Sequence, residues 1–286
     1  MKKMNWKYIA ASVAIAAAAV LTGCGGTSSD GENTAKPTAE HPRKVLIGVR
    51  QDLFPTSYVD ESGKITGYDI DMARKIDELL PQYEFEYEPV SQEALLTGLQ
   101  SGKYAAAVAG FYDSKARREQ YLFPKEPIGG NLIGLTVLKS NANLKNLEDI
   151  HDQHKTIAPI ATTSGMYGIV VNYNNDHPDK QVELVNSDWT DIAVELKWIT
   201  DGRYDALVSS KNVADQAWKK LGLQDQLVFN PFTAIKTYSL FNPKEQELAD
   251  AYDGALKKLK EDGTASKISK TYFGEDVLPY ISKSKE

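Results

Sequence analysis

The alternation of short apolar runs with amphipathic segments, which begins near residue 44, is the feature that most constrains how this chain folds. A run at 45–49 predicts a strand, and Ile70, Ala73 and Ile76 then recur at helical spacing before Pro81 ends the segment. The same alternation predicts further strands at 83–87, 104–109, 133–138, 156–160, 182–185 and 206–209, and helices around Leu95, after Ser164, around Leu196, around Leu256 and ending near Gly274. Because helices that connect such short strands cover both faces of a parallel sheet, the sequence predicts two α/β units.

The amino terminus has the composition of an export signal. Three lysines precede an apolar stretch at 8–20, and small residues close the stretch just before Cys24. The stretch is about 13 residues long, shorter than the roughly 20 that cross a bilayer as a helix, which favours a signal peptide at 1–23 over a permanent span.

The string L-T-G-C at 21–24 resembles the lipobox of bacterial lipoproteins, in which the cysteine is lipidated and becomes the first residue. An ordinary signal peptide with a chance cysteine is the alternative. Two acyl chains on Cys24 would anchor the protein to a membrane. Residues 24–42, which are rich in Gly, Ser, Thr, Glu and Pro, would then form a flexible tether.

The charge balance and the available side chains exclude several classes of function. The chain has 33 basic and 39 acidic residues, and three lysines precede Cys24, so the remainder has 30 against 39 and a formal net charge of −9. Without a basic block, nucleic-acid binding is not expected. Cys24 is the only cysteine, which excludes thiolate metal sites and an internal disulfide. His151 and His154 could share a metal but have no third ligand nearby, and common nucleotide-binding and hydrolase motifs are missing, so we expect neither a metal nor another cofactor.

Three polar loops follow predicted strands, which is where ligands bind in open α/β sheets. The loops cover residues 50–58, 110–117 and 161–165. The first offers Phe54 and Tyr58 as aromatic surface, the second ends at Arg117, and the third opens a helix with Thr162 and Thr163. Each feature alone has an ordinary alternative, a helix cap or a solvated arginine. Together, the guanidinium and the free N–H groups of helix starts predict a carboxylate site.

Six short strings along the chain are informative when they are taken together. They are G-K-I-T-G-Y-D-I-D at 63–71, L-Q-S-G-K-Y at 99–104, the segment 110–117, T-T at 162–163, D-G-R-Y-D-A at 201–206, and E-D-G-T at 261–264 leading to Y-F-G at 272–274. In these strings and in their order, the chain resembles, from residue 44 to 274, the polar amino-acid solute-binding proteins of ABC importers. The resemblance implies an α/β, two-lobed type II periplasmic-binding-protein fold with two hinge strands. Lobe 1 would comprise residues 43–130 and 233–286, lobe 2 residues 131–232, and the hinge crossings would lie near Gly130 and Thr233.

The resemblance also implies where a ligand binds. In the family, the arginine matched by Arg117 holds the α-carboxylate with help from amides matched by Tyr112 and Thr163, and the ammonium is held partly at positions matched by Gly110 and Tyr112. The expected ligand-binding residues are Arg50, Phe54, Tyr58, Gln92, Gly110, Phe111, Tyr112, Arg117, Thr162, Thr163 and Ser210.

Four positions depart from the family pattern and leave the identity of the solute open. Ser210 stands where the family places an acid, Gln92 and Leu53 stand where it places aromatic side chains, and Arg50 occupies a position that is often polar or acidic.

The resulting hypothesis is a monomeric, lipid-anchored receptor on the extracytoplasmic face of the cell membrane. It would capture an amino acid or a similar small carboxylate between its lobes and deliver it to the membrane subunits of an ABC permease, without breaking a bond. A surface sensor or adhesin on the same fold is an alternative, and a periplasmic dehydratase-like enzyme is another.

Overall fold

The computed structural model describes residues 36–188 and 191–283. The signal peptide expected at 1–23, the lipidation site expected at Cys24 and most of the expected tether therefore lie outside the described residues. The last part of the expected tether, residues 36–42, contains no helix or strand and is largely exposed. Within the described ranges, no helix is both long enough and apolar enough to cross a membrane.

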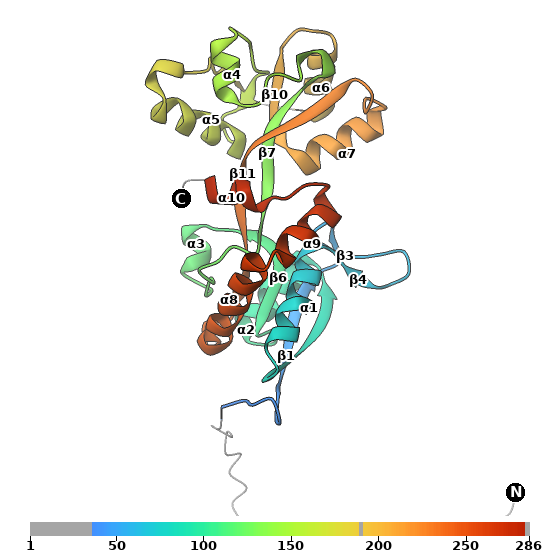
Figure 1. The fold of residues 1–286 in the computed structure, drawn as a ribbon, viewed down its shortest axis with the longest axis vertical. Helices are drawn as coiled ribbons and strands as arrows, with labels where there is room; N and C mark the ends of the chain where they lie inside the picture. Colours follow the sequence, from blue (N-terminus) through green and yellow to red (C-terminus); the bar gives the residue numbers. More distant parts are fainter. Residues whose placement is uncertain (1–35, 189–190, 284–286) are drawn as a thin grey trace, which may run out of the picture. The chain divides into compact units, whose positions relative to one another are not determined.

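Strands and helices alternate through the middle of the described chain, which begins with consecutive strands and ends with consecutive helices (Figure 1). In order, they are β1 (Arg43–Arg50), β2 (Asp52–Leu53), β3 (Ser57–Val59), β4 (Ile65–Thr66), α1 (Tyr68–Leu79), β5 (Tyr83–Val90), α2 (Gln92–Ser101), β6 (Ala106–Tyr112), α3 (Lys115–Arg118), β7 (Gly129–Leu138), the 3-10 turn η1 (Lys139–Asn141), α4 (Leu147–Asp152), β8 (Ile160–Ala161), α5 (Gly165–Asp176), the 3-10 turn η2 (Pro178–Lys180), β9 (Asn186–Ser187), α6 (Ile192–Thr200), β10 (Ala206–Ser210), α7 (Lys211–Leu221), β11 (Leu227–Phe241), α8 (Gln246–Glu261), α9 (Thr264–Phe273) and α10 (Leu278–Lys283).

The main sheet is mixed, whereas the sequence predicted parallel strands. Six strands lie in the order β10-β7-β11-β6-β1-β5. β1 is parallel to β5 and β6, as expected, but β11 is antiparallel to both β6 and β7, and β10 is antiparallel to β7. The prediction of parallel pairing failed for the second group because the apolar pattern did not indicate β11. This 15-residue strand contains the expected crossing at Thr233, returns alongside β7 and reverses the direction of pairing.

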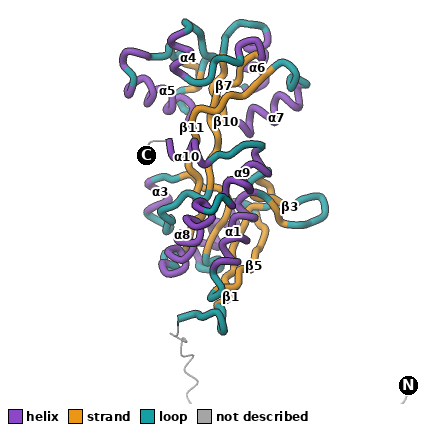
Figure 2. The backbone as a smooth tube through the Cα atoms, viewed as in Figure 1, coloured by secondary structure: helices purple, strands orange, loops and turns teal. Residues whose placement is uncertain are grey.

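Two sets of hydrophobic cores lie at the two ends of the long strands β7 and β11. In the first set, alternate residues of β6 face opposite sides, so that Ala106 and Val108 pack with α1 and α8, while Ala107 and Ala109 pack with α2. The second set gathers apolar residues of β7 and β10 with α4, α5 and α6. The fold is thus α/β and two-lobed, and β7 and β11 are the strands that run from one end to the other (Figure 2). The lobe boundaries named above stay predictions.

The paired strands β7 and β11 are irregular close to the expected crossing points. Their register shifts between Pro231 and Thr233, where Thr233 lies opposite Ile133. On one side, α10 covers the pair, because Val277 and Ile281 form a small core with Leu132 and Ala234.

The remaining sequence predictions held to different degrees. The helices expected around Leu95, after Ser164 and around Leu196, and the long helix around Leu256, are α2, α5, α6 and α8. The strand expected at 156–160 is reduced to a bridge at Ile157 and the two-residue β8, and the strand expected at 182–185 is replaced by β9, which begins at Asn186. These segments pair over only two residues, so their apolar character reflects burial more than strand formation.

Candidate functional site

A cavity of about 360 Å³ lies where the main sheet, α1 and α7 meet. Its volume is at the lower end of the range for small-molecule sites, and its lining mixes aromatic surface with a few polar groups, as in such sites. The lining residues are Arg50, Leu53, Phe54, Thr56, Tyr68, Asp69, Gln92, Ala109, Gly110, Phe111, Tyr112, Arg117, Gly130, Asn131, Ser210, Asn212, Val213, Gln216, Thr237 and Phe273. We call this the inter-lobe cavity.

Arg117 reaches the inter-lobe cavity from the short helix α3, which follows β6. The side chain of Ser114 caps α3 by accepting a hydrogen bond from the Arg117 amide at 3.3 Å. The Arg117 guanidinium donates from Nη1 to the backbone oxygen of Tyr112 at 2.7 Å, and its Cζ lies 5.5 Å from the centre of the Phe111 ring. Among the described residues it has no acidic partner, so Nε and Nη2 are available to an anion.

Gly110 lets β6 approach α1 at the base of the cavity. Its φ of +57° belongs to the left-handed region, where glycine is favoured, and a Cβ there would lie 3.2 Å from Thr56 Cγ2 and 3.5 Å from Asp69 Oδ2. The tight packing explains why this residue is a glycine inside a strand.

Asp69, in the first turn of α1, is the one carboxyl group in the cavity lining. It is fully buried, and neither oxygen has a hydrogen-bond partner of good geometry among the described residues. Burial raises its pKa to about 8, although the nearby Gly110 amide acts in the opposite direction. Near neutral pH this group is therefore mostly an uncharged acid.

Arg50, at the end of β1, is held from two sides. Its Nε lies 2.9 Å and its Nη2 lies 2.8 Å from Oδ1 of Asp52, while Nη1 donates to Oε1 of Gln92 at 2.7 Å. Gln92 is the first residue of α2, so the guanidinium bridges two elements of lobe 1.

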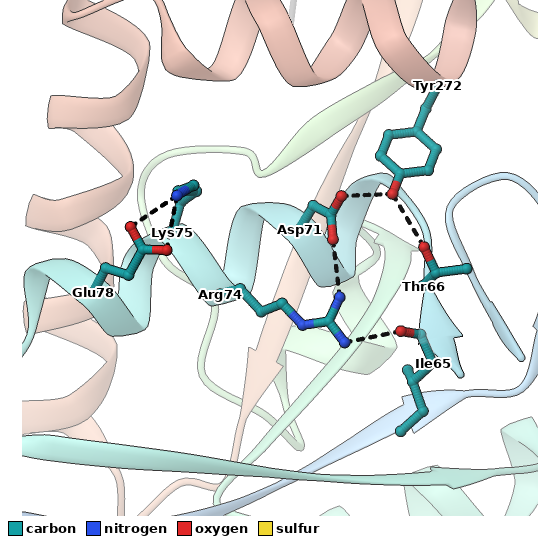
Figure 3. A network of polar contacts seen from close by, with 7 residues as sticks. All are labelled: Ile65, Thr66, Asp71, Arg74, Lys75, Glu78 and Tyr272. Atoms are coloured by element: carbon teal, nitrogen blue, oxygen red, sulfur yellow. Dashed lines mark hydrogen bonds and ion pairs between the residues drawn. The ribbon is translucent and has the colours of Figure 1, made fainter. Parts of the chain in front are cut away.

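A polar network fixes the start of α1 relative to β4 and α9 (Figure 3). The Tyr272 hydroxyl donates to Oδ2 of Asp71 at 2.6 Å and lies 3.1 Å from the Thr66 hydroxyl. Arg74 joins Asp71 Oδ1 at 3.0 Å to the Ile65 carbonyl oxygen at 2.8 Å. Because Tyr68 and Asp69 precede Asp71 and Phe273 follows Tyr272, the network holds three cavity-lining side chains in place without touching the cavity itself.

Lobe 2 contributes to the cavity through the start of α7. Ser210, Asn212, Val213 and Gln216 line it, and among the described residues the side chains of Asn212 and Gln216 make no hydrogen bond. The sequence prediction named Ser210 and missed the other three. The rule that ligands bind beyond strand ends would have found them, since they follow β10 directly.

The structure brings together eight of the eleven residues expected to bind a ligand. Arg50, Phe54, Gln92, Gly110, Phe111, Tyr112, Arg117 and Ser210 line the cavity. Tyr58 does not line it but packs edge-on against Phe54, with ring centres 5.0 Å apart. Thr162 and Thr163 also lie outside its lining, on the loop between β8 and the N-cap Ser164 of α5. Thr56, Asp69, Asn131 and Thr237 are lining residues that were not expected.

A larger groove of about 980 Å³ lies along α5 and β11. Its Arg118 is paired with Asp113 through contacts of 2.5 to 2.9 Å, and its other charged groups are of both signs. An anion at Arg118 would have to displace Asp113, and the other basic residues of the groove, Lys125 and Lys236, lack the two-pronged geometry of a guanidinium. Arg117 in the inter-lobe cavity has no acidic partner to displace among the described residues. The inter-lobe cavity is therefore the better candidate for a carboxylate site.

Comparison with known proteins identifies the family of the chain. Residues 45–275 match the family of bacterial extracellular solute-binding proteins, family 3. The L-cystine-binding protein TcyJ of Bacillus subtilis is 29% identical over 244 residues, which cover 85% of this chain and 88% of TcyJ. A solved structure from work on glutathione import in Gram-positive bacteria, via GshT and the cystine ABC importer TcyBC of Streptococcus mutans, is 27% identical with a TM-score of 0.52, and the match covers 83% of this chain and 98% of that one.

The same fold occurs in the unliganded L-cystine solute receptor of Neisseria gonorrhoeae, at 21% identity and a TM-score of 0.63, over 84% of this chain and 96% of that one. The family match extends from β1 to the residues just after α9, and so includes the elements that build the inter-lobe cavity. This chain belongs to the bacterial extracellular solute-binding proteins of family 3.

Proposed function

We propose that this chain is the solute-binding component of an ABC importer and that it holds an amino acid, or a similar small carboxylate, in the inter-lobe cavity. The observation that carries the proposal is the Arg117 guanidinium, which lines that cavity, is oriented by the Tyr112 carbonyl and has no acidic partner among the described residues. Relatives that are named for their ligands point to the same class, since their names give L-cystine, arginine and glutamine.

The chemistry of the cavity fits an α-carboxylate. A guanidinium presents parallel N–H groups that match the two oxygens of a carboxylate, and such charge-assisted bonds are stronger than neutral ones. The Phe111 ring beside the guanidinium and the partly enclosed wall reduce competition from water. Polar groups at Tyr112, Asn131 and Thr237 surround the same space and can serve the ammonium.

Binding is expected to draw the lobes together, because both lobes line the cavity and, among the described elements, only β7 and β11 run between them as long strands. Small-angle X-ray scattering should show a smaller radius of gyration with a saturating solute, and identical profiles would argue against closure. The closed form would be what the permease recognises, and no bond would be broken.

We also propose that Cys24 carries the lipid that keeps the protein at the extracytoplasmic face of the cell membrane. The string at 21–24 and the single cysteine support this. In cell fractionation, Cys24→Ser should shift the protein out of the membrane-bound, processed pool, and normal processing and retention would contradict lipidation.

A thermal-shift screen of amino acids against their carboxamide derivatives tests the proposed function. A solute that binds only the folded protein raises its stability by about 2.7 kcal/mol at a concentration of 100 times Kd. At least one amino acid should stabilise the protein, and its α-carboxamide should do so much less. A screen in which no amino acid shifts the transition would contradict the proposal.

A further inference from the structure

We infer that the bound solute carries a second anionic group and that Arg50 is the residue that selects for it. The inference rests on the proposed function, because it takes Arg117 as the site of the first carboxylate.

The inter-lobe cavity contains two guanidinium groups and no permanently charged acid. Within the part of the chain that the structure describes, Arg50, Asp69 and Arg117 are the only Asp, Glu, Lys or Arg residues in its lining. Since burial raises the pKa of Asp69 to about 8, that group is mostly uncharged near neutral pH. The carboxylate of a zwitterionic solute would balance the positive charge of Arg117. Its ammonium would then lie in a cavity that is also lined by the positively charged Arg50. A solute with one more carboxylate than ammonium groups fits this charge distribution better.

Arg50 is built into the cavity wall rather than extended into solvent. Its side chain is 19% exposed, and Gln92 fixes one end of the guanidinium from α2 through a 2.7 Å hydrogen bond. An arginine held in this way presents its charge at a fixed position and loses little conformational entropy on binding an anion.

Asp52, the acidic partner of Arg50, is much more exposed than Arg50 itself, at 61%. An ion pair with a well-solvated carboxylate contributes little free energy. Both contacts go to Oδ1, so the pair is not the parallel two-oxygen arrangement that binds most strongly. A solute carboxylate can therefore share or replace Asp52 at small cost, and Asp52 holds the guanidinium ready until a solute arrives.

The ordinary alternative is that Arg50 serves only to join β1, β2 and α2. In that role its removal would weaken the binding of all solutes alike, by loosening the loop that carries Phe54. Selection for a second anion predicts a loss confined to solutes that have one. Isothermal titration calorimetry can separate the two roles with solutes that differ only at the second group.

The matched pairs are L-glutamate and L-glutamine, 2-aminoadipate and its δ-amide, and γ-glutamylglycine and γ-glutamylglycinamide. They place the second carboxylate at three distances from the first. One of these distances should match the spacing between Arg117 and Arg50. For that pair, the diacid should bind at least about tenfold more tightly than its amide, which corresponds to about 1.4 kcal/mol. Arg50→Gln should reduce that ratio to below about threefold, because the diacid should lose much more affinity than its amide.

Asp52→Asn supplies a test with the opposite sign. Removing the competing carboxylate should strengthen binding of the diacid severalfold and leave the amide unchanged, which a purely structural role of the pair does not predict. Circular dichroism of both variants checks that they fold.

The outcomes separate this inference from the proposed function. If neutral amino acids bind and no diacid is preferred over its amide, or if Arg50→Gln weakens both members of a pair equally, the inference is wrong and the proposed function stands. If no amino acid of any kind binds, both are wrong.

Discussion

The two lobes contribute to the inter-lobe cavity in different ways. On the lobe 1 side, Arg117 is oriented by the Tyr112 carbonyl, Arg50 by Gln92 and Asp52, and the Tyr112 hydroxyl by Asn131 at 2.8 Å. On the lobe 2 side, Asn212 and Gln216 project from the first turns of α7 and make no hydrogen bond to a described residue. Lobe 1 therefore presents fixed, charged donors, and lobe 2 presents neutral amides that can adapt.

This difference implies a division of roles. Fixed donors lose little entropy on binding, so Arg117 supplies most of the affinity for the α-carboxylate that every solute of the class shares, and Arg50 adds affinity for solutes with a second anionic group. Amides that can both donate and accept adjust to the remaining groups of the solute. We therefore expect removal of a lobe 1 guanidinium to reduce affinity strongly for the solutes that it contacts, and changes in lobe 2 to have smaller effects on affinity and to alter the ranking of solutes.

The largest effect is expected from Arg117→Ala. Removing one partner of a desolvated charge pair costs roughly 2 to 5 kcal/mol, so calorimetry with the best amino acid from the screen should show affinity reduced by about a hundredfold or more. Arg118→Ala is the matched control, because Arg118 is the next residue, pairs with Asp113 and lies outside the inter-lobe cavity. The affinity of the Arg118→Ala variant should stay within about twofold of that of the native protein. Equal losses for the two variants would place the carboxylate elsewhere.

The next effect concerns the base of the cavity. Asp69 has a pKa of about 8 in the folded protein, above its ordinary value of 3.8, so the folded state binds more protons than the unfolded state between these values. The free energy of unfolding should therefore fall as pH rises across this window, by up to about 1.4 kcal/mol per pH unit from this group. Asp69→Asn should remove that part of the slope.

Urea unfolding of the native protein and the variant at pH 5.5, 7 and 8.5 measures this difference. Asp250→Asn, at an exposed carboxylate on α8, is the control and should leave the slope unchanged. An identical slope in the native protein and Asp69→Asn would show that Asp69 titrates near its ordinary pKa.

The smallest effects are expected in lobe 2. A neutral hydrogen bond contributes about 0.5 to 1.5 kcal/mol, so Asn212→Ala and Gln216→Ala should each weaken the best solute by about two- to tenfold. They should also change the ranking of solutes in the screen. Lys219→Ala, on the same helix but exposed and outside the cavity, should do neither. A hundredfold loss from either amide would contradict the division of roles.

Most of lobe 1 could be predicted from sequence because its elements have strong periodic patterns. Ile70, Ala73 and Ile76 marked α1, and the apolar run at 45–49 marked β1. The loops after the strands predicted at 45–49 and 104–109 then led to Arg50, Phe54 and Arg117, which line one cavity.

The lobe 2 side was harder to predict, in part for physical reasons. The helix α7 was missed although Ala214, Ala217, Trp218 and Leu221 recur at helical spacing, so its sequence could have revealed it. β11 combines buried and half-buried residues irregularly and contains Pro231, so its burial pattern does not alternate from residue to residue.

Asp69 was not recognised as a lining residue because nothing in its local sequence reveals that it becomes fully buried.

The most direct test of the central claim is a crystal structure of the protein with the tightest solute from the screen. The account predicts that the α-carboxylate lies within hydrogen-bonding distance of the Arg117 guanidinium, and that the other end of the solute contacts Asn212 or Gln216 of α7. A solute whose carboxylate is held by lobe 2, or one bound in the groove along α5 and β11, would contradict it.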